Sequence, residues 1–353
     1  MRLLLGHAGP PATPDSLWSS WGTDPFVYTG LLLAGWLYLS GLRKLWGAAG
    51  IGRGVSRTRA ASFLVGLVVC WVALESPIGA LGSAVFWGHM LQHELLAVVA
   101  APLLILGEPG IVVPRALPPR WRRRLGRLEH RLAGAGQTSS TAIRYVAAFL
   151  VFAASFWVWH APTLYDAAAR SDLVHSIQHL TFLVGAVLFW YAAISRRGRR
   201  NPLAGIALVF AGLLQGVWGG MTFVFANQPI YRAYSTTTRP WGLEPVEDLN
   251  IGGVIMLAAG PIMAFSALAL IVSFLTSMER SEAGTDGGRV PVRGWSGAAP
   301  LAAPGEPRSS DSALVEMDPS DMGQLYEGGG QRDGGRDTDH AGGIARNRWT
   351  GGG

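Results

Sequence analysis

Cysteine is nearly absent from this sequence. Cys70 is the only cysteine among 353 residues, which excludes an intrachain disulfide and a metal cluster held by several thiolates. Charge is scarce too, because Asp, Glu, Lys and Arg together make up 15% of the chain, whereas a soluble domain carries about 25%. Many of these charges fall after residue 278, so the rest of the chain is poorer still. These scarcities argue against a soluble globular protein.

The chain contains long apolar runs with few charged residues. Hydrophobic residues make up 49% of the chain, and seven runs have roughly the 20 residues that a helix needs to span a bilayer. The sequence therefore predicts an all-α membrane protein, a bundle of seven transmembrane helices. The expected spans are 26–42, 60–78, 84–106, 141–159, 173–194, 203–225 and 249–277.

The basic residues between the spans indicate the orientation of the bundle. Loops 43–59, 107–140 and 196–200 hold 16 basic residues, whereas the segments on the opposite side hold four. Because cytoplasmic loops carry the excess of Lys and Arg, we expect the N-terminus outside and the C-terminus in the cytoplasm. The formal net charge of +6 follows from this loop pattern, so we do not interpret it as a nucleic-acid-binding surface.

Two terminal segments flank the expected transmembrane domain, 26–277. Residues 1–25 are polar and are expected to form an extracytoplasmic N-terminal segment. Residues 278–353 are rich in Gly, Asp, Arg and Pro and cannot bury enough apolar surface to offset the entropy of ordering, so we expect a disordered cytoplasmic tail. Within the loops, the segment WRRRLGRLEHRL at 121–132 fits an amphipathic helix on the membrane surface.

Five histidines lie within or beside the spans. His89 and His93 are four residues apart in the third span, which puts both imidazoles on one face of a helix. His175 and His179 repeat this spacing at the start of the fifth span, and His160 follows the fourth span. In the expected orientation all five lie in the outer third of the membrane. Ionisable side chains are costly at that depth, so they are candidates for a functional site.

Other polar and sulfur-containing side chains share this depth, whereas the cytoplasmic ends of the spans carry no comparable set. They are Glu75, Met90, Gln92, Gln178, Met221 and Asp248. This one-sided distribution is the strongest functional signal in the sequence.

These residue types fit a metal site. Imidazole binds copper, zinc, iron and nickel, and thioether sulfur favours cuprous copper. Two helices with a His-x3-His pair could present four ligands, with His160 as a fifth ligand or at the mouth of the site. Ligand histidines usually hydrogen-bond a second group through the outer nitrogen, and Glu75, Gln92 and Gln178 are candidates for that role. Met90 is either apolar packing or a sulfur ligand, and the same holds for Met221.

The residues alone leave other interpretations open. The polar groups could form a structural network of interhelical hydrogen bonds. A haem b electron carrier would take one axial histidine from each of two helices. A proton or metal transporter would use Glu75 and the histidines as a relay, but it would need polar residues that continue to the cytoplasmic side. The sequence shows no set of nucleophile, base and oxyanion donors, so we expect neither catalysis nor a soluble substrate.

Five motifs follow one another through the spans: GHMLQHELL, WHAPTLYDAA, HSIQHLTFLVGAVLFW, GGMTFVFANQPIYRAY and EDLNIGGVIM. In this order they resemble the multi-span CtaG family of bacterial cytochrome c oxidase assembly proteins, over roughly residues 25–277. The resemblance implies a multi-pass protein of the bacterial plasma membrane that helps to assemble a haem–copper oxidase, with copper as the metal it handles. The matched positions are His89, His93, His160, His175, His179, Met221 and Asp248.

The combined prediction is a copper site at the outer face, at which the histidine pairs of the third and fifth spans meet. Copper is the expected cofactor and haem b the alternative. The expected partners are oxidase subunits and the lipid bilayer, with no nucleic acid. The prediction requires the third and fifth spans to be neighbours.

Overall fold

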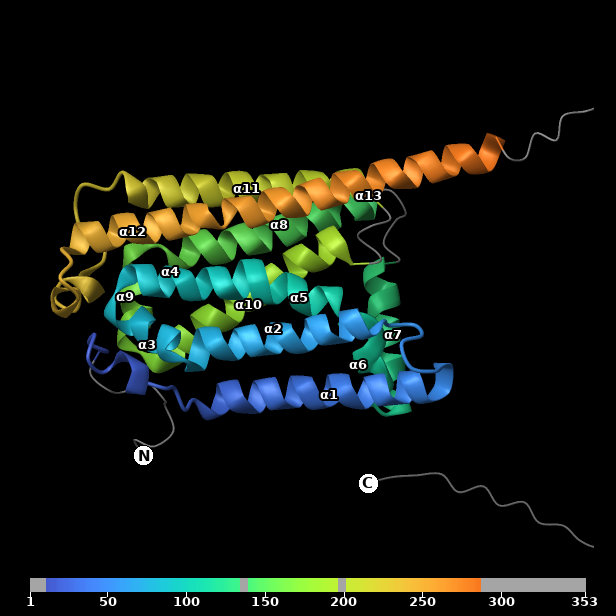
Figure 1. Cartoon of the computed structure of the whole chain (residues 1–353), viewed down its shortest axis with the longest axis horizontal. Coiled ribbons are helices and arrows are strands. Elements are labelled where there is room, and N and C mark those ends of the chain that lie inside the picture. Colours follow the sequence, from blue (N-terminus) through green and yellow to red (C-terminus); the bar gives the residue numbers. More distant parts are fainter. Residues whose placement is uncertain (1–10, 134–138, 196–200, 287–353) are drawn as a thin grey trace, which may run out of the picture. The chain divides into compact units, whose positions relative to one another are not determined.

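The computed structural model describes residues 11–133, 139–195 and 201–286. Every regular element in these ranges is helical, and no strand occurs in them. Seven of the described helices are long and apolar enough to cross a membrane (Figure 1). They are α1 (Pro25–Ala49), α2 (Arg57–Glu75), the composite helix Phe86–Leu106, α8 (Ser139–Trp159), α10 (Asp172–Ile194), α11 (Pro202–Val224) and the composite helix Pro245–Thr276. The predicted seven-helix fold is confirmed.

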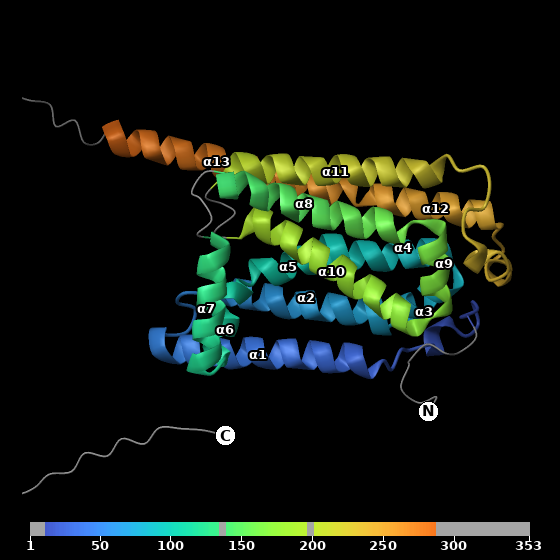
Figure 2. The same ribbon diagram turned by 180° about the vertical axis from the view of Figure 1, so that it is seen from behind.

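The third span, Phe86–Leu106, lies at the centre of the described helices. In Figure 1, α1 and α2 lie on one side of it, and α11 and the last span lie on the other. Seen from behind, the oblique α10 crosses it (Figure 2). In its most apolar stretch 56% of the residues are buried, more than in any other span. Side chains on this helix therefore meet neighbours from most of the bundle.

The helix α11 and the last span approach each other closely at two glycines. A Cβ atom on Gly220 would lie 2.9 Å from the carbonyl oxygen of Gly253, and one on Gly253 would lie 2.7 Å from that of Gly220. Small residues allow such close packing of helices in a membrane. The contact holds the start of the last span, which carries Asp248, against the rest of the bundle.

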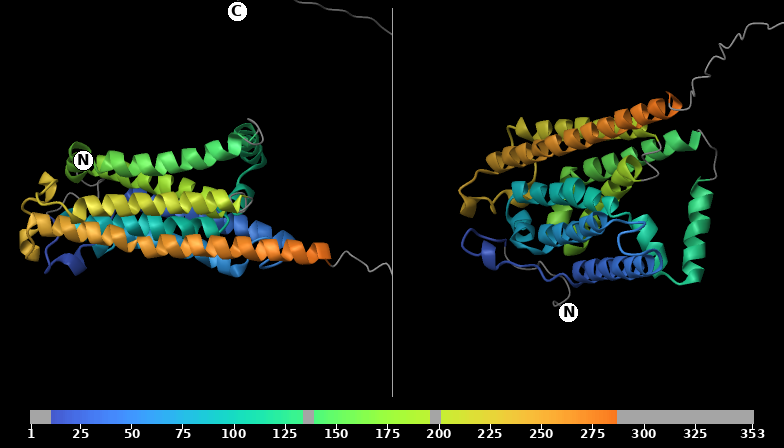
Figure 3. Two further views of the ribbon diagram at one scale, coloured as in Figure 1. Left: turned by 90° about the horizontal axis from the view of Figure 1, so that it is seen from above. Right: turned by 45° about the vertical axis from the view of Figure 1, so that its right-hand side comes forward.

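Short helices close the two ends of the bundle. At one end lie α3 (Pro77–Ala84) and α9 (Pro162–Arg170), with the 3-10 turns η1 (Leu17–Ser19), η4 (Arg232–Tyr234) and η5 (Arg239–Trp241). We call this the histidine end, because the histidine pairs lie there. At the other end lie α6 (Pro109–Ala116) and α7 (Pro119–Ala133). We call this the arginine end. The helix α7 stands across the direction of the spans (Figure 3), which agrees with the predicted surface helix at 121–132.

Two buried polar side chains at the arginine end, Tyr38 and Glu108, have hydrogen-bonding or ion-pair partners. The hydroxyl of Tyr38 donates a hydrogen bond to the carbonyl oxygen of Gly107 at 2.7 Å. Arg59 forms an ion pair with Glu108 at 2.9 Å. The Tyr38 ring also stacks on Phe63, with 3.8 Å between the ring centroids. This end therefore combines aromatic packing with satisfied hydrogen-bonding groups.

The third span is not a uniform α-helix. Its parts are α4 (Phe86–Glu94), the π-helix η2 (Leu95–Ala100) and α5 (Ala101–Leu106). In a π-helix each carbonyl accepts from the amide five residues later, but for Ala97 that residue is Pro102, which has no N–H. The indole nitrogen of Trp190 on α10 donates to the Ala97 carbonyl instead, at 2.8 Å. This bond links the fifth span to the third.

The last span is also divided. Its parts are α12 (Pro245–Ala258) and α13 (Gly260–Asp286). Pro261 cannot donate to the carbonyl of Leu257, which interrupts the α-helical hydrogen-bond pattern at this point. The helix α13 continues past the predicted end of the span at 277. The remainder of the expected tail, 287–353, lies outside the described residues, as do residues 1–10 of the N-terminal segment.

Candidate metal centre

Asp248 of α12 holds the start of α4. Its carboxylate accepts hydrogen bonds from the backbone N–H groups of Phe86 at 2.7 Å and Trp87 at 3.1 Å. The first N–H groups of a helix have no partner within it, and Val85, which precedes α4, provides no side-chain cap. The fully buried Asp248 supplies this cap from another helix. It thereby positions His89, which lies about one turn into α4.

His89, His175 and His179 come together at the histidine end. Their candidate ligand nitrogens all lie within 4.8 Å of one another. His89 and His179 are buried, and His175 is half-buried, so it is the most accessible of the three. His89 donates a hydrogen bond to the carbonyl of Gly82, and its Nε2 has no hydrogen-bond partner among the described residues. The third and fifth spans are therefore neighbours, as the sequence predicted.

His93 lies beside this trio. Its ring centroid is 4.4 Å from that of His89 and 5.3 Å from that of His179, and its ring stacks on Phe182 at 4.1 Å. The side chain is 3% exposed, and neither ring nitrogen has a hydrogen-bond partner in the described part of the chain. The two predicted histidine pairs thus form a trio and a fourth ring in contact with it.

His160 lies close to the thioether of Met90. Its Nδ1 is 2.8 Å from the carbonyl oxygen of Phe156, so Nδ1 carries the hydrogen and donates it. Nε2 then holds a lone pair, and it lies 3.5 Å from Sδ of Met90. Burial lowers the pKa of His160 to about 4, although the hydrogen bond to Phe156 raises it. The ring is therefore neutral at pH 7.

Aromatic side chains surround the histidines: Phe86, Tyr165, Tyr231 and Tyr234. The Tyr165 ring lies 5.2 Å from His89 and stacks on Tyr231 at 4.0 Å. The hydroxyls of Tyr165 and Tyr234 share a hydrogen bond of 3.0 Å, and Tyr234 donates to the Gly82 carbonyl at 3.0 Å. Burial raises the pKa of Tyr165 and of Tyr234. Both hydroxyls are therefore neutral and act as hydrogen-bonding groups.

Residues 36–277 match the protein family described as "Cytochrome c oxidase caa3 assembly factor (Caa3_CtaG)". This match covers more than half of the chain and includes every histidine of the site. The chain belongs to this family. Its family is thus one of oxidase assembly factors, as the motifs predicted, and its fold is that of a multi-pass membrane protein.

Curated relatives of this Caa3_CtaG chain occur in mycobacteria. An uncharacterized protein of Mycobacterium bovis is 27% identical over 266 residues, which is 68% of this chain and 39% of that protein, and one of Mycobacterium tuberculosis gives the same values. An uncharacterized protein of Mycobacterium leprae is 25% identical over 290 residues, which is 79% of this chain and 43% of that protein. The chain spans about two fifths of the length of these relatives. No solved structure matches it.

Two predicted partners of the imidazoles have other contacts in this Caa3_CtaG protein. The amide nitrogen of Gln92 donates to the carbonyl of Ala73 on α2 at 2.9 Å. The carboxylate of Glu75 accepts from the backbone N–H of Asp24 at 3.2 Å. Neither side chain hydrogen-bonds a histidine in the described structure. Both instead tie the end of α2 to its surroundings.

The two remaining predicted residues differ in burial. Gln178 on α10 is fully buried, and neither its amide nitrogen nor its amide oxygen has a partner among the described residues. Met221 on α11 is 39% exposed, whereas Met90 is 1% exposed. Of these two methionines, Met90 is therefore the one whose sulfur lies among the buried side chains around the histidines.

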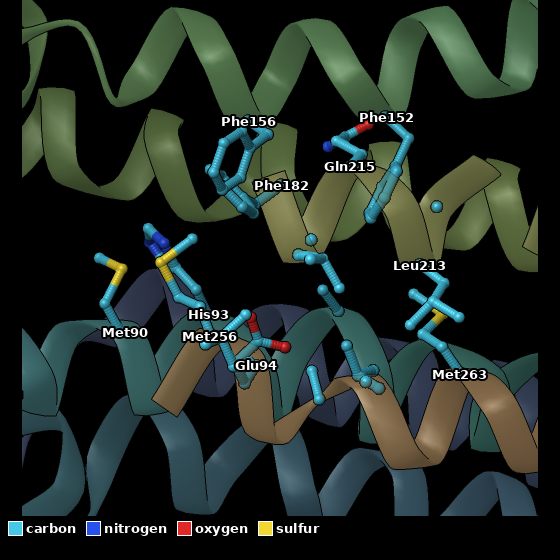
Figure 4. Close-up of a pocket in the computed structure, with 18 of the residues that line it drawn as sticks. Met90, His93, Glu94, Phe152, Phe156, Phe182, Leu213, Gln215, Met256 and Met263 are labelled. Carbon is cyan, nitrogen blue, oxygen red and sulfur yellow. The ribbon is translucent and has the colours of Figure 1, made fainter. Parts of the chain in front are cut away.

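A cavity beside His93 contains residues that were not among the predicted site residues. Glu94, Gln215 and Met256 line it together with His93 and Met90 (Figure 4). The side-chain oxygen of Gln215 is buried and has no hydrogen-bond partner among the described residues. Glu94 and Gln215 could have been found as polar residues within apolar spans. Met256 gives no such signal, because methionine is common in apolar helices.

Proposed function

We propose that this protein helps to assemble a haem–copper cytochrome c oxidase by binding copper at His89, His175 and His179. Membership of an assembly-factor family supports the assembly role. The metal role rests on one observation, the convergence of three imidazoles whose candidate ligand nitrogens lie within 4.8 Å of one another. No catalytic step is part of the proposal.

The donor set suits a transition-metal ion that has to be released again. Imidazole is a good ligand for copper, and three histidines leave a coordination position open for a further ligand. The Nε2 atom of His89 is buried without a hydrogen-bond partner among the described residues, so a bound ion would satisfy it. His175 is only half-buried, which gives an ion a route to and from the trio.

The distribution of arginine supports an orientation with the histidine end outside. The arginine-rich segments that the structure describes, among them α7, lie at the opposite end of the bundle, and cytoplasmic loops carry the excess of basic residues. In the plasma membrane of a bacterium, copper would then be handled at the outer face. Oxidase subunits would bind at the histidine end to receive it.

The test is metal analysis of the full-length protein purified in detergent. We expect about one copper ion per trio, as three-histidine sites hold a single ion, and a loss of this copper in the His89→Ala/His179→Ala variant. His130→Ala is the matched control, because His130 belongs to α7 at the arginine end, and it should bind as much copper as the wild type. In a bacterial host without its own assembly factor, the double variant should leave the oxidase deficient in copper.

Five results would contradict the proposal. If the wild-type protein holds copper only at background level, or if the double variant keeps its copper, the proposed metal site is wrong. If the purified protein holds zinc in place of copper, the proposed identity of the metal is wrong. A Soret band that disappears in the double variant would replace copper by haem b. An oxidase with full copper content in cells that carry the double variant would remove the assembly role of the trio.

A further inference from the structure

The contact between His160 and Met90 brings together two atoms that both hold lone pairs. Nδ1 of His160 carries the ring hydrogen, because its neighbour at 2.8 Å is the carbonyl oxygen of Phe156. Nε2 therefore cannot donate, and Sδ of Met90, at 3.5 Å, has no hydrogen to offer. The exposed fractions are 7% for His160 and 1% for Met90. A buried lone pair on nitrogen thus faces a buried lone pair on sulfur.

Two further donors lie next to this pair. His93 follows Met90 by three residues on α4, which places both on one face of the helix, and its ring centroid is 6.0 Å from that of His160. Met256 on α12 is 3% exposed and lines the same cavity as Met90, His93 and His160. Figure 4 shows the side chains of Met90, His93 and Met256 gathered at one end of that cavity. Two thioethers and two imidazoles therefore share one buried space.

We propose that Met90, His93, His160 and Met256 form a second metal site, selective for a soft monovalent ion such as cuprous copper. Thioether sulfur is a soft ligand that favours cuprous copper. Imidazole and thioether bind a metal as neutral groups, and burying a single positive charge among four such donors is far less costly than burying two, because the Born cost rises with the square of the charge. The identity of the natural ion rests on the copper role proposed above, whereas the site itself does not.

The distance between the two lone pairs agrees with shared coordination. With metal–nitrogen and metal–sulfur bonds of about 2.0 and 2.3 Å, two ligands separated by 3.5 Å subtend about 110° at the ion, close to the tetrahedral angle. A packing contact alone would not require both atoms to present lone pairs to each other. The arrangement is therefore already close to that of a bound state.

His93 connects this second site to the histidine trio. Its ring contacts His89 at 4.4 Å and His179 at 5.3 Å on one side, and it lines the cavity of the second site on the other. An ion could therefore pass from the all-imidazole trio to the sulfur-containing site through one shared ligand. The trio, which includes the half-buried His175, is more accessible than the second site, which includes the fully buried Met90.

The test uses the full-length protein labelled with selenomethionine and loaded anaerobically with cuprous copper. We expect X-ray absorption at the copper edge to show selenium as a neighbour of copper in the wild type. The signal should be reduced in Met90→Leu and in Met256→Leu, and lost when both methionines are replaced. Met263→Leu is the matched control, because Met263 is buried and lines the same cavity away from His93 (Figure 4), and it should keep the signal. Silver(I), a redox-inert soft ion, should bind at least about tenfold more weakly to Met90→Leu, since loss of a ligand costs at least as much as loss of its supporting partner.

The same measurements separate this proposal from the one on the trio. Absence of copper–selenium scattering in the wild type, or an unchanged signal in Met90→Leu, overturns the second site. Loss of one copper equivalent with retained copper–selenium scattering in His175→Ala/His179→Ala supports both sites. Unchanged copper in the His175→Ala/His179→Ala variant, combined with a reduced selenium signal in Met90→Leu, overturns the trio and leaves the second site standing. The unfolding temperature of each variant is compared with that of Met263→Leu. Equal unfolding temperatures show that a lost signal does not come from unfolding.

Discussion

The histidine end and the arginine end differ in whether their buried polar groups have hydrogen-bond partners. At the arginine end, the Tyr38 hydroxyl donates to a carbonyl and Arg59 is paired with Glu108. At the histidine end, His93 and Gln178 are buried with no hydrogen-bond partner for their side-chain nitrogens among the described residues. Each such buried group destabilises a protein by about 1–3 kcal/mol. A bundle assembled for stability alone would not concentrate these groups at one end.

The difference separates the part of the molecule that maintains the fold from the part that binds. A polar group without a partner retains its capacity to bind something else, and a metal ion can use a lone pair that no hydrogen bond occupies. The histidine end also has its own structural bonds, such as the cap that Asp248 provides for α4. The comparison can therefore be tested by removing structural groups and unpartnered groups separately.

The largest effect is expected for Asp248→Ala. The substitution leaves the N–H groups of Phe86 and Trp87 without the carboxylate that accepts from them. Since hydrogen bonds to a charged group contribute about 1.5–3 kcal/mol, we expect a loss of about 3 kcal/mol in the free energy of unfolding. Thermal unfolding in detergent, followed by tryptophan fluorescence, measures it. Asp15→Ala, at an exposed position, is the control, and equal melting of the two variants would show that Asp248 is not a structural cap.

The next largest effect is expected for Trp190→Phe. The variant keeps an aromatic ring but loses the N–H that donates to the Ala97 carbonyl in the π-helix, and an unsatisfied buried carbonyl destabilises by about 2 kcal/mol. Trp218→Phe is the matched control, because Trp218 is 71% exposed and such surface changes stay within about 0.5 kcal/mol. If both variants unfold at the same temperature, the bond between the third and fifth spans does not contribute to stability.

A gain in stability is expected for Gln178→Met. The change removes a fully buried amide that has no partner among the described residues, so the metal-free protein should become more stable by about 1 kcal/mol. Gln92→Met is the control from the same end, because Gln92 donates to the Ala73 carbonyl and its loss should be destabilising. Isothermal denaturation of both variants measures whether the free energy of unfolding rises or falls in each. A destabilised Gln178→Met would mean that this amide is part of the fold and not of the binding region.

The smallest effect is expected for the ion pair at the arginine end. Arg59 is about one third exposed, and exposed or half-exposed pairs contribute about 0.5 kcal/mol. A double-mutant cycle with Arg59→Ala and Glu108→Ala should therefore give a coupling energy of about this size. Copper content should stay unchanged in all variants of the cycle. Loss of copper in any of them would show that the two ends are not independent.

The elements that the sequence predicted correctly depend on local pattern and depth. Length and hydropathy identify the seven spans, because a bilayer admits only long apolar helices. The His-x3-His spacing places His89 and His93 on one face, and the loop arginines put both histidine pairs at the same end. Together these observations were sufficient to predict that the third and fifth spans meet through their histidines.

The details that the sequence did not predict depend on contacts between helices. The Gln92 amide was expected to support an imidazole, yet it donates to Ala73, because the face of α4 that carries it packs against α2. Met90 and Met221 could not be ranked from the sequence, and only packing shows that Met90 is buried and Met221 exposed. The cap from Asp248 joins residues that are 162 positions apart, a distance at which no local pattern carries information.

The π-helix in the third span changes how the faces of this helix relate along its length. An α-helix returns to the same face after about 11 residues, or three turns, and a π segment adds one residue to that interval. Eleven residues after His93 comes Leu104, but the buried residue is Ile105, one position later. The part of the span after Ala100 is therefore rotated by roughly a quarter of a turn relative to an unbroken helix. Accessibility or cross-linking scans of this span have to be interpreted with two helical wheels, one for each side of residues 95–100.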